Sequence, residues 1–191
     1  MELIEISRPH FDVEVDMVYA TTNNFTGSKV YKRPGCYLHP TAARLLAKAI
    51  KLAAQQNLKF RIYDTFRPTE AQLVLWKHTP DPNFLADPKK GSPHSRGIAI
   101  DLTLINTNGE VLEMGTAYDS FTPLSHHGSI EISPEAQQNR YILLGIMTAA
   151  GWDFYKNEWW HYQLFNSQEY PLLSDSVLIE GIMPTGSEIL K

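Results

Sequence analysis

The feature that most constrains the fold of this chain is the alternating segment GIAIDLTL, which begins at Gly97. Side chains of a strand point alternately to its two faces, so this alternation indicates a strand with one face on the core. Its apolar face comprises Ile98, Ile100, Leu102 and Leu104. Asp101 falls on the other face, and we expect its carboxylate to point away from the core, on the exposed side of the strand.

Two further segments have strand character. LKFRIYDTF, at residues 58–66, alternates in the same way and is expected to end near Arg67 and Pro68, where the proline interrupts regular pairing. WDFY and WWHYQL are rich in aromatic residues and are separated by a turn at Lys156 and Asn157. We therefore expect a closing hairpin, and Arg67 at the exit of a strand.

Three segments have the spacing or the end signals of helices. Apolar residues recur at helical intervals from Pro40 to Asn57, and a shorter helix is expected over residues 69–76. Ser133, followed by a proline and a glutamate, is a strong helix start, and Gly151 ends that helix. This order of elements predicts one α+β domain, residues 1–191, with a mainly antiparallel sheet flanked by helices.

The composition of the chain narrows the classes of partner that it is expected to bind. Charged residues make up 20% of the chain, the formal net charge is -4 and no basic run exceeds Lys89-Lys90, so a nucleic-acid partner is not expected. No window approaches the roughly 18 apolar residues of a membrane-spanning helix, and the N-terminus lacks the regions of a signal peptide. We therefore expect a cytoplasmic protein without a membrane partner, and set no expectation for its oligomeric state. The single cysteine, Cys36, excludes an internal disulfide and a multi-thiolate metal site.

The segment SPHSRGIAID places His94 seven positions before Asp101. Alone, such a pair is more often a solvated histidine and a turn carboxylate than two ligands of one metal. On a straight strand the two residues would lie roughly 23 Å apart and on opposite faces. Gly97 removes this obstacle, because glycine adopts left-handed backbone conformations that let the His94 loop fold back over the strand.

A second fragment, EWWH at residues 158–161, adds an acid and a histidine. On a helix Glu158 and His161 would share a face, whereas the aromatic run favours a strand that begins near Trp159. Each also has an ordinary interpretation, as an exposed turn acid and a hydrogen-bonded histidine. With the first pair, however, the fragment gives two imidazoles, one carboxylate and a spare acid. Two histidines and one acid with an open fourth position form a ligand set of catalytic zinc. Glu158 could then act as general base, and Arg67 could stabilise an oxyanion.

Several ordered motifs together resemble the D-alanyl-D-alanine dipeptidases, zinc enzymes best known from vancomycin resistance. They are YATTNNFTG, YDTFRP, SPHSRGIAIDLTL, EMGTAYDSF followed by SHH, and GWDFYKNEWWHYQL. The similarity extends from about Tyr19 to Leu164. It implies an α+β zinc-peptidase fold shared with bacterial D,D-carboxypeptidases and, more distantly, with Hedgehog signalling domains.

Carried over motif by motif, the resemblance implies that His94, Asp101 and His161 bind one zinc ion per chain. It also makes Glu158 the general base and Arg67 the group that stabilises the transition-state oxyanion. The paired histidines His126 and His127 are a rival metal site by composition, but adjacent side chains diverge on an extended backbone. The family motif implies a supporting role for them near the pocket.

The same resemblance assigns substrate contacts to Tyr19, Ser92 and Asp119. A free amino terminus is best met by a carboxylate, which suits Asp119, and a free carboxy terminus by hydroxyls or a cation. Without the resemblance, the ordinary interpretations are core packing for Tyr19, loop capping for Ser92 and a turn acid for Asp119.

The expected reaction is hydrolysis of the dipeptide D-Ala-D-Ala to two D-alanines. An alternative is a D,D-carboxypeptidase or endopeptidase that acts on peptidoglycan stem peptides with the same zinc chemistry. A third is a zinc-containing binding or signalling module without hydrolysis. Glu158 and Arg67 argue against that module, because a structural zinc needs no base and usually has four protein ligands.

Overall fold

In the computed structural model, which describes residues 2–184, a five-stranded sheet runs through the molecule in the order β2-β4-β5-β7-β6. Its strands are β2 (Glu14–Val15), β4 (Lys59–Asp64), β5 (Ala99–Ile105), β7 (His161–Gln163) and β6 (Asp153–Phe154). β2 pairs with β4 in parallel and the other neighbours pair antiparallel. A separate two-stranded sheet pairs β1 (Ile4–Glu5) with β3 (Tyr37–Leu38).

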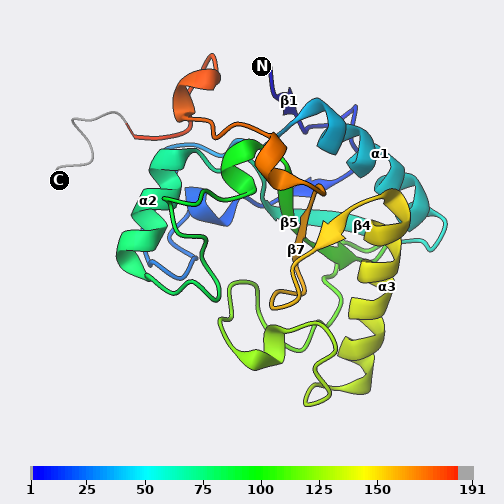
Figure 1. The fold of residues 1–191 in the computed structure, drawn as a ribbon. Helices are drawn as coiled ribbons and strands as arrows, with labels where there is room; N and C mark the ends of the chain where they lie inside the picture. The colour runs from blue at the N-terminus through cyan, green and yellow to red at the C-terminus, as the bar shows by residue number, and fades with distance from the viewer. Residues whose placement is uncertain (1, 185–191) are drawn as a thin grey trace.

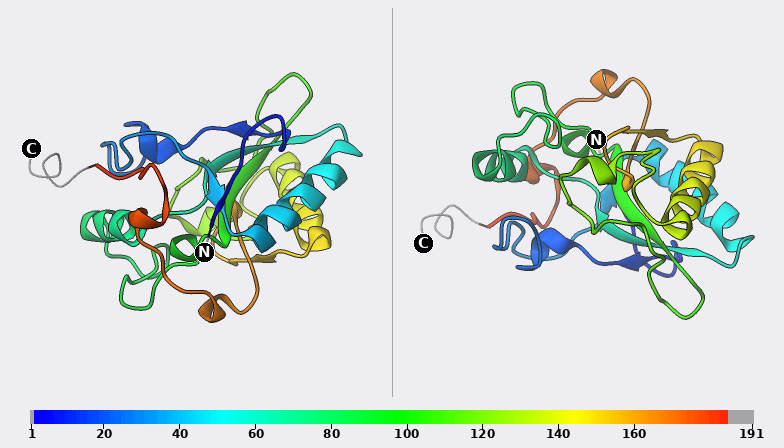
Figure 2. Two further views of the ribbon diagram at one scale, coloured as in Figure 1. Left: turned by 90° about the horizontal axis from the view of Figure 1, so that it is seen from above. Right: turned by 90° about the horizontal axis from the view of Figure 1, so that it is seen from below.

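Helices lie on both sides of the large sheet. α1 (Pro40–Ala54) and α3 (Pro134–Ala150) pack against each other on one side, and α2 (Thr69–His78) lies on the other side (Figures 1 and 2). Within residues 2–184 there are also five 3-10 helices: Val18–Ala20, His94–Arg96, Pro123–Ser125, Ser167–Glu169 and Asp175–Val177. The predicted α+β class, with a mainly antiparallel sheet and flanking helices, is confirmed. Met1 and residues 185–191 of the predicted domain lie outside the described residues.

The helix ends follow from local chemistry. Ser133 Oγ accepts a hydrogen bond from the Ala136 amide at 3.1 Å, and Pro134 occupies the first turn, as the sequence predicts. Gly151 closes α3 with a left-handed φ of 111°. α1 buries a stripe of alanine and leucine side chains against the core. Cys36, which precedes this helix, is a buried thiol without a disulfide partner among the described residues. Among the described residues, no helix combines the length and apolarity needed to span a bilayer.

One prediction about the central strand is wrong. Every residue of β5 is buried, and Asp101 is only 2% exposed, so its face of the strand is not solvent-exposed. The His94–Arg96 turn packs against β5, and the Tyr118 hydroxyl bonds the Asp101 carboxylate from another loop. The closing hairpin forms as predicted, but its second strand begins at His161 rather than near Trp159.

Candidate active site

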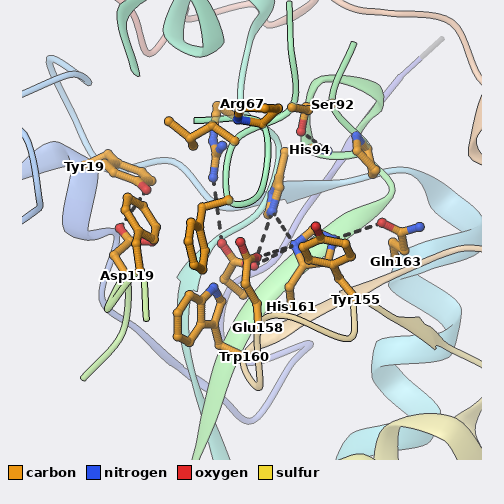
Figure 3. A pocket seen from close by; sticks show the side chains of 17 residues that line it. Tyr19, Arg67, Ser92, His94, Asp119, Tyr155, Glu158, Trp160, His161 and Gln163 are labelled. Carbon is orange, nitrogen blue, oxygen red and sulfur yellow. Dashed lines mark hydrogen bonds and ion pairs between the residues drawn. The ribbon is translucent and has the colours of Figure 1, made fainter. Parts of the chain in front are cut away.

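Three side chains from separate elements converge on one point of the sheet (Figure 3). His94 comes from a 3-10 helix, Asp101 from β5 and His161 from β7. Asp101 and His161 are register partners in the antiparallel β5–β7 pair, which places them side by side. His161 Nδ1 lies 3.0 Å from Asp101 Oδ1 and 3.1 Å from His94 Nε2, and His94 Nε2 lies 3.3 Å from Asp101 Oδ1. One donor atom from each residue therefore faces the same small space.

Gly97 provides the predicted bend. It ends the His94–Arg96 turn in the left-handed region, with φ of 69° and ψ of 18°. The chain reverses there before entering β5, so His94 lies over the strand instead of extending along it. A residue with a Cβ atom would be strained at this φ, and the added Cβ would lie 2.9 Å from Leu3 Cδ2.

The outer nitrogens of both imidazoles face acceptors. His94 Nδ1 lies 2.7 Å from the Thr65 carbonyl oxygen, and His161 Nε2 lies 3.0 Å from Gln163 Oε1. Because a carbonyl oxygen only accepts, each outer nitrogen carries a proton, and in its neutral form each imidazole therefore presents a lone pair at its inner nitrogen. Two lone pairs and a carboxylate then face one another with no hydrogen between them, an arrangement that fits a bound divalent cation.

The carboxylate of this group is held in its charged form. Burial alone would raise the pKa of Asp101, but without a bound cation the positive charge and hydrogen bonds of protonated His94 and His161 outweigh it and hold the pKa well below its usual range. Asp101 Oδ2 also accepts a hydrogen bond of 2.9 Å from the Tyr118 hydroxyl. The anionic ligand is therefore oriented by a neighbour on its second oxygen.

Glu158 lies beside this group without belonging to it. Its Oε2 is 3.9 Å from His161 Nδ1, and the side chain is 6% exposed in the wall of the same pocket. Burial, together with the negative charges of Asp101 and Asp119, raises the pKa of Glu158 well above its usual value, against the opposing effect of Arg67. A buried carboxylate of raised pKa next to a cation site has the properties of a proton acceptor.

Arg67 points into the pocket from the segment between β4 and α2 (Figure 3). Its Nε donates to Asp64 Oδ2 at 2.8 Å, its Nη1 donates to Gln72 Oε1 at 3.0 Å, and its Nη2 lies 3.8 Å from Asp101 Oδ2. The guanidinium also lies over the Tyr19 ring, 5.3 Å from its centre. These contacts fix a buried cation close to the metal-facing carboxylate.

Sequence reasoning missed Asp64 and Gln72. Asp64 lies on the same face of β4 as the buried residues Phe60 and Ile62. A carboxylate at a core-facing position of the strand was the feature of the sequence that could have identified it. Such a group needs partners, and Asp64 has Arg67 and the Tyr31 hydroxyl, the latter at 2.9 Å. No such signal marks Gln72. Its role depends on two tertiary contacts: its Oε1 accepts a hydrogen bond from Arg67, and its Nε2 donates one to the Ala86 carbonyl.

The three predicted substrate residues line the same pocket, which has a volume of about 240 Å³. The Tyr19 hydroxyl donates to Asp119 Oδ2 at 2.8 Å, and Ser92 Oγ accepts from the His94 amide at 3.2 Å. Burial, reinforced by the Asp101 charge, raises the pKa of Asp119 to about 8. Residues from the loop after α2 and from the hairpin complete the wall: Pro82, Phe84, Leu85, Ala86, Tyr155, Trp160 and Gln163.

The paired histidines do not join the metal-facing group. The set of close donors found within residues 2–184 consists of His94, Asp101 and His161. The His127 ring packs instead against Phe154 and Tyr162, where burial and the Arg140 charge lower its pKa to about 4.

Comparison with known proteins agrees with this geometry. Residues 1–177 match the family described as D-Ala-D-Ala dipeptidase. The chain is 41% identical over 174 residues to a D-alanyl-D-alanine dipeptidase of Escherichia coli, covering 91% of this chain and 90% of that protein. It is 36% identical to one from Enterococcus faecium and 33% to one from Enterococcus faecalis, in each case over 83% of this chain and 89% of the relative. The resemblance inferred from the motifs is confirmed: this chain belongs to the D-Ala-D-Ala dipeptidase family, and it is an enzyme, a metallopeptidase.

Proposed function

We propose that this enzyme hydrolyses D-Ala-D-Ala to two D-alanines with one zinc ion bound by His94, Asp101 and His161. The observation that carries the proposal is the pocket in which these donors, a buried acid, a buried arginine and an Asp–Tyr pair all face one small volume. The four curated relatives that cover most of this chain share the name D-alanyl-D-alanine dipeptidase, which supports the choice of substrate.

The donor set suits zinc. The ligand atoms would be His94 Nε2, Asp101 Oδ1 and His161 Nδ1, and two imidazoles with one carboxylate leave a fourth position open for chemistry. Bound there, Zn²⁺ would supply Lewis acidity that polarises the peptide carbonyl and makes a water molecule nucleophilic near neutral pH. The Thr65 carbonyl and Gln163 amide keep both imidazoles in the tautomer that this role requires.

Glu158 is the proposed general base. Its carboxylate takes the proton from the attacking water and later passes it to the nitrogen of the departing D-alanine. Arg67 is proposed to stabilise the oxyanion that develops on the peptide carbonyl, because its guanidinium is already held in the pocket by Asp64 and Gln72. A charge fixed before the reaction needs little reorganisation when the oxyanion forms.

The ends of the pocket would recognise the two charged termini of a dipeptide. Asp119 is proposed to bind the substrate ammonium group, while its Oδ2 atom accepts a hydrogen bond from the Tyr19 hydroxyl. Ser92 is also proposed to bind the substrate. An acylated or longer peptide has no ammonium group at this position and would leave the half-buried Asp119 carboxylate without a cation. This geometry supports a dipeptidase over a carboxypeptidase that acts on stem peptides.

The base assignment is tested with Glu158→Gln, which keeps the size of the side chain and removes its basicity. We expect zinc content to stay at one per chain and turnover of D-Ala-D-Ala to fall by roughly 10²- to 10⁴-fold, the usual contribution of a general base. Glu131→Gln, at an exposed position outside the pocket, is the control and should keep full turnover. Unchanged turnover in Glu158→Gln would overthrow the role of Glu158.

A further inference from the structure

Arg140 is a buried cation that the catalytic proposal does not use. It lies on α3, is 3% exposed, and has no carboxylate within ion-pair distance among residues 2–184. Burial lowers its pKa to about 10, against the opposing effect of Glu113. Burying a charge without an opposite charge is costly, and an apolar side chain would pack a helix against its neighbours at lower cost. The presence of Arg140 in the core must therefore be explained by the groups to which it hydrogen-bonds.

The guanidinium binds the backbone at both ends of one loop. Its Nε donates to the Met114 carbonyl at 2.7 Å, and its Nη1 donates to the carbonyls of Leu124 and His126 at 2.8 and 3.1 Å. Its face lies 5.8 Å from the ring centre of Trp159, the residue after Glu158. One side chain thus joins the beginning and the end of residues 114–126 to α3.

This loop carries the residues that close the site. Tyr118 bonds the metal-facing carboxylate Asp101, Asp119 bonds Tyr19, and Phe121 lines the pocket. The backbone–backbone hydrogen bonds that residues 114–122 make within the described structure are short-range turns, from Ser120 to Ala117, from Thr122 to Ser120 and from Ser125 to Thr122. Asp119 itself has a left-handed φ of 57°, which a non-glycine residue keeps only when its surroundings hold it.

We propose that Arg140 is a positioning residue for substrate recognition: it holds the 114–126 loop so that Asp119 meets the substrate ammonium group. The proposal rests on the proposed dipeptidase function and on the ammonium-binding role of Asp119. It assigns Arg140 no contact with substrate or metal, because its donors are directed at loop carbonyls. Losing it should therefore misplace Asp119 and weaken substrate binding more than the chemical step.

The test compares Arg140→Lys and Arg140→Met with wild type in D-Ala-D-Ala hydrolysis, with zinc content and melting temperature measured alongside. We expect zinc content to be retained and KM to rise by roughly 10- to 100-fold for Arg140→Met, the cost of a displacement of about an ångström. Arg140→Lys, which keeps a charge and three donors, should show a smaller rise. A lower kcat and melting temperature with unchanged KM would mean a structural role only and would overturn the proposal.

Ser133→Ala is the matched control, since it weakens the same helix by removing its N-cap without touching the loop carbonyls. It should lower the melting temperature and leave KM unchanged. If Arg140→Met does not fold, the test instead compares Arg140→Lys and Asp119→Asn, each alone, with the two combined. A residue that acts through Asp119 adds nothing further to the loss in kcat/KM there, whereas full additivity of the two losses would overturn the proposal. An inactive wild type would instead refute the dipeptidase function itself, so the two failures are distinguishable.

Discussion

Asp119 combines a left-handed backbone with two features that disfavour a charged carboxylate: partial burial and the nearby negative charge of Asp101. Its hydrogen bond from Tyr19 offsets only part of this cost, because the pKa of Asp119 remains raised to about 8. Functional sites commonly hold such groups at the expense of stability. In the proposed substrate complex, the ammonium group of the dipeptide would supply the partner that this carboxylate lacks.

This strain predicts a pH-dependent effect of Asp119→Asn on the free energy of unfolding. A carboxyl whose folded pKa is raised binds its proton more tightly in the folded state. Its contribution to stability is therefore complete below the ordinary pKa of 3.8 and is lost as pH rises through about 8. Asparagine stays neutral and tolerates the left-handed backbone. The metal-free variant should match wild type near the ordinary pKa of aspartate and exceed it by on the order of a few kcal/mol above the raised pKa.

Urea unfolding of both metal-free proteins across this pH range measures the difference. Parallel pH profiles would contradict the raised pKa of Asp119. In the metal-loaded enzyme the same variant should lose kcat/KM for D-Ala-D-Ala, because the amide cannot pair with the ammonium group as a charge.

The predictable part of the site came from residue types and order. His94, Asp101, His161, Glu158 and Arg67 could be proposed as one group from their sequence motifs, and they line one pocket. The residues that hold them could not. Partners such as the Thr65 carbonyl and Gln72 are set by tertiary contacts, and no spacing in the sequence encodes those contacts.

Among the elements, the turn that ends at Gly97 matters most for metal binding. We expect Gly97→Ala to cost about 1–2 kcal/mol from its left-handed φ, and more from the close approach to Leu3. Because the strain falls between His94 and β5, affinity for zinc should also fall. Chemical denaturation and zinc titration measure the two effects.

Gly128→Ala is the matched control, because Gly128 has a φ of 77° and an added Cβ would meet nothing within 4 Å. It should show the backbone cost without the loss of zinc affinity. Equal zinc affinity in both variants would contradict the role of the Gly97 bend.

Element types were well predicted because helix ends and alternation are local signals. Ser133, Gly151 and the segment after Pro40 behave as their residue types require. The exposed face expected for Asp101 was wrong, because burial of a strand face depends on loops distant in sequence. The loop with Tyr118 and the turn with His94 cover that face.

At the scale of the whole molecule, the pocket gains its shape from segments far apart in the chain. The irregular loop after α2 meets the hairpin, where the Tyr155 hydroxyl donates to the Asn83 carbonyl at 2.9 Å, and Phe84 stacks on Phe121 with ring centres 5.0 Å apart. The prolines and polar residues of this segment are typical of a loop, but they do not encode such contacts.

Because these contacts enclose the pocket, we expect the enzyme to select its substrates by peptide length. N-acetyl-D-Ala-D-Ala and a stem pentapeptide should be cleaved with kcat/KM at least ~10²-fold below that of D-Ala-D-Ala, since each would leave the half-buried Asp119 without its ammonium partner. Release of D-alanine from equal concentrations of the three substrates measures this. Comparable cleavage of the pentapeptide would favour the carboxypeptidase alternative.

We propose that one zinc ion, bound by His94, Asp101 and His161, enables hydrolysis of D-Ala-D-Ala at this site. The most direct measurement is a titration of metal-free protein with Zn²⁺ while release of D-alanine is followed. We expect negligible release without zinc and a linear rise that reaches its plateau at one zinc per chain. Full release from metal-free protein, or none at any zinc concentration, would contradict it.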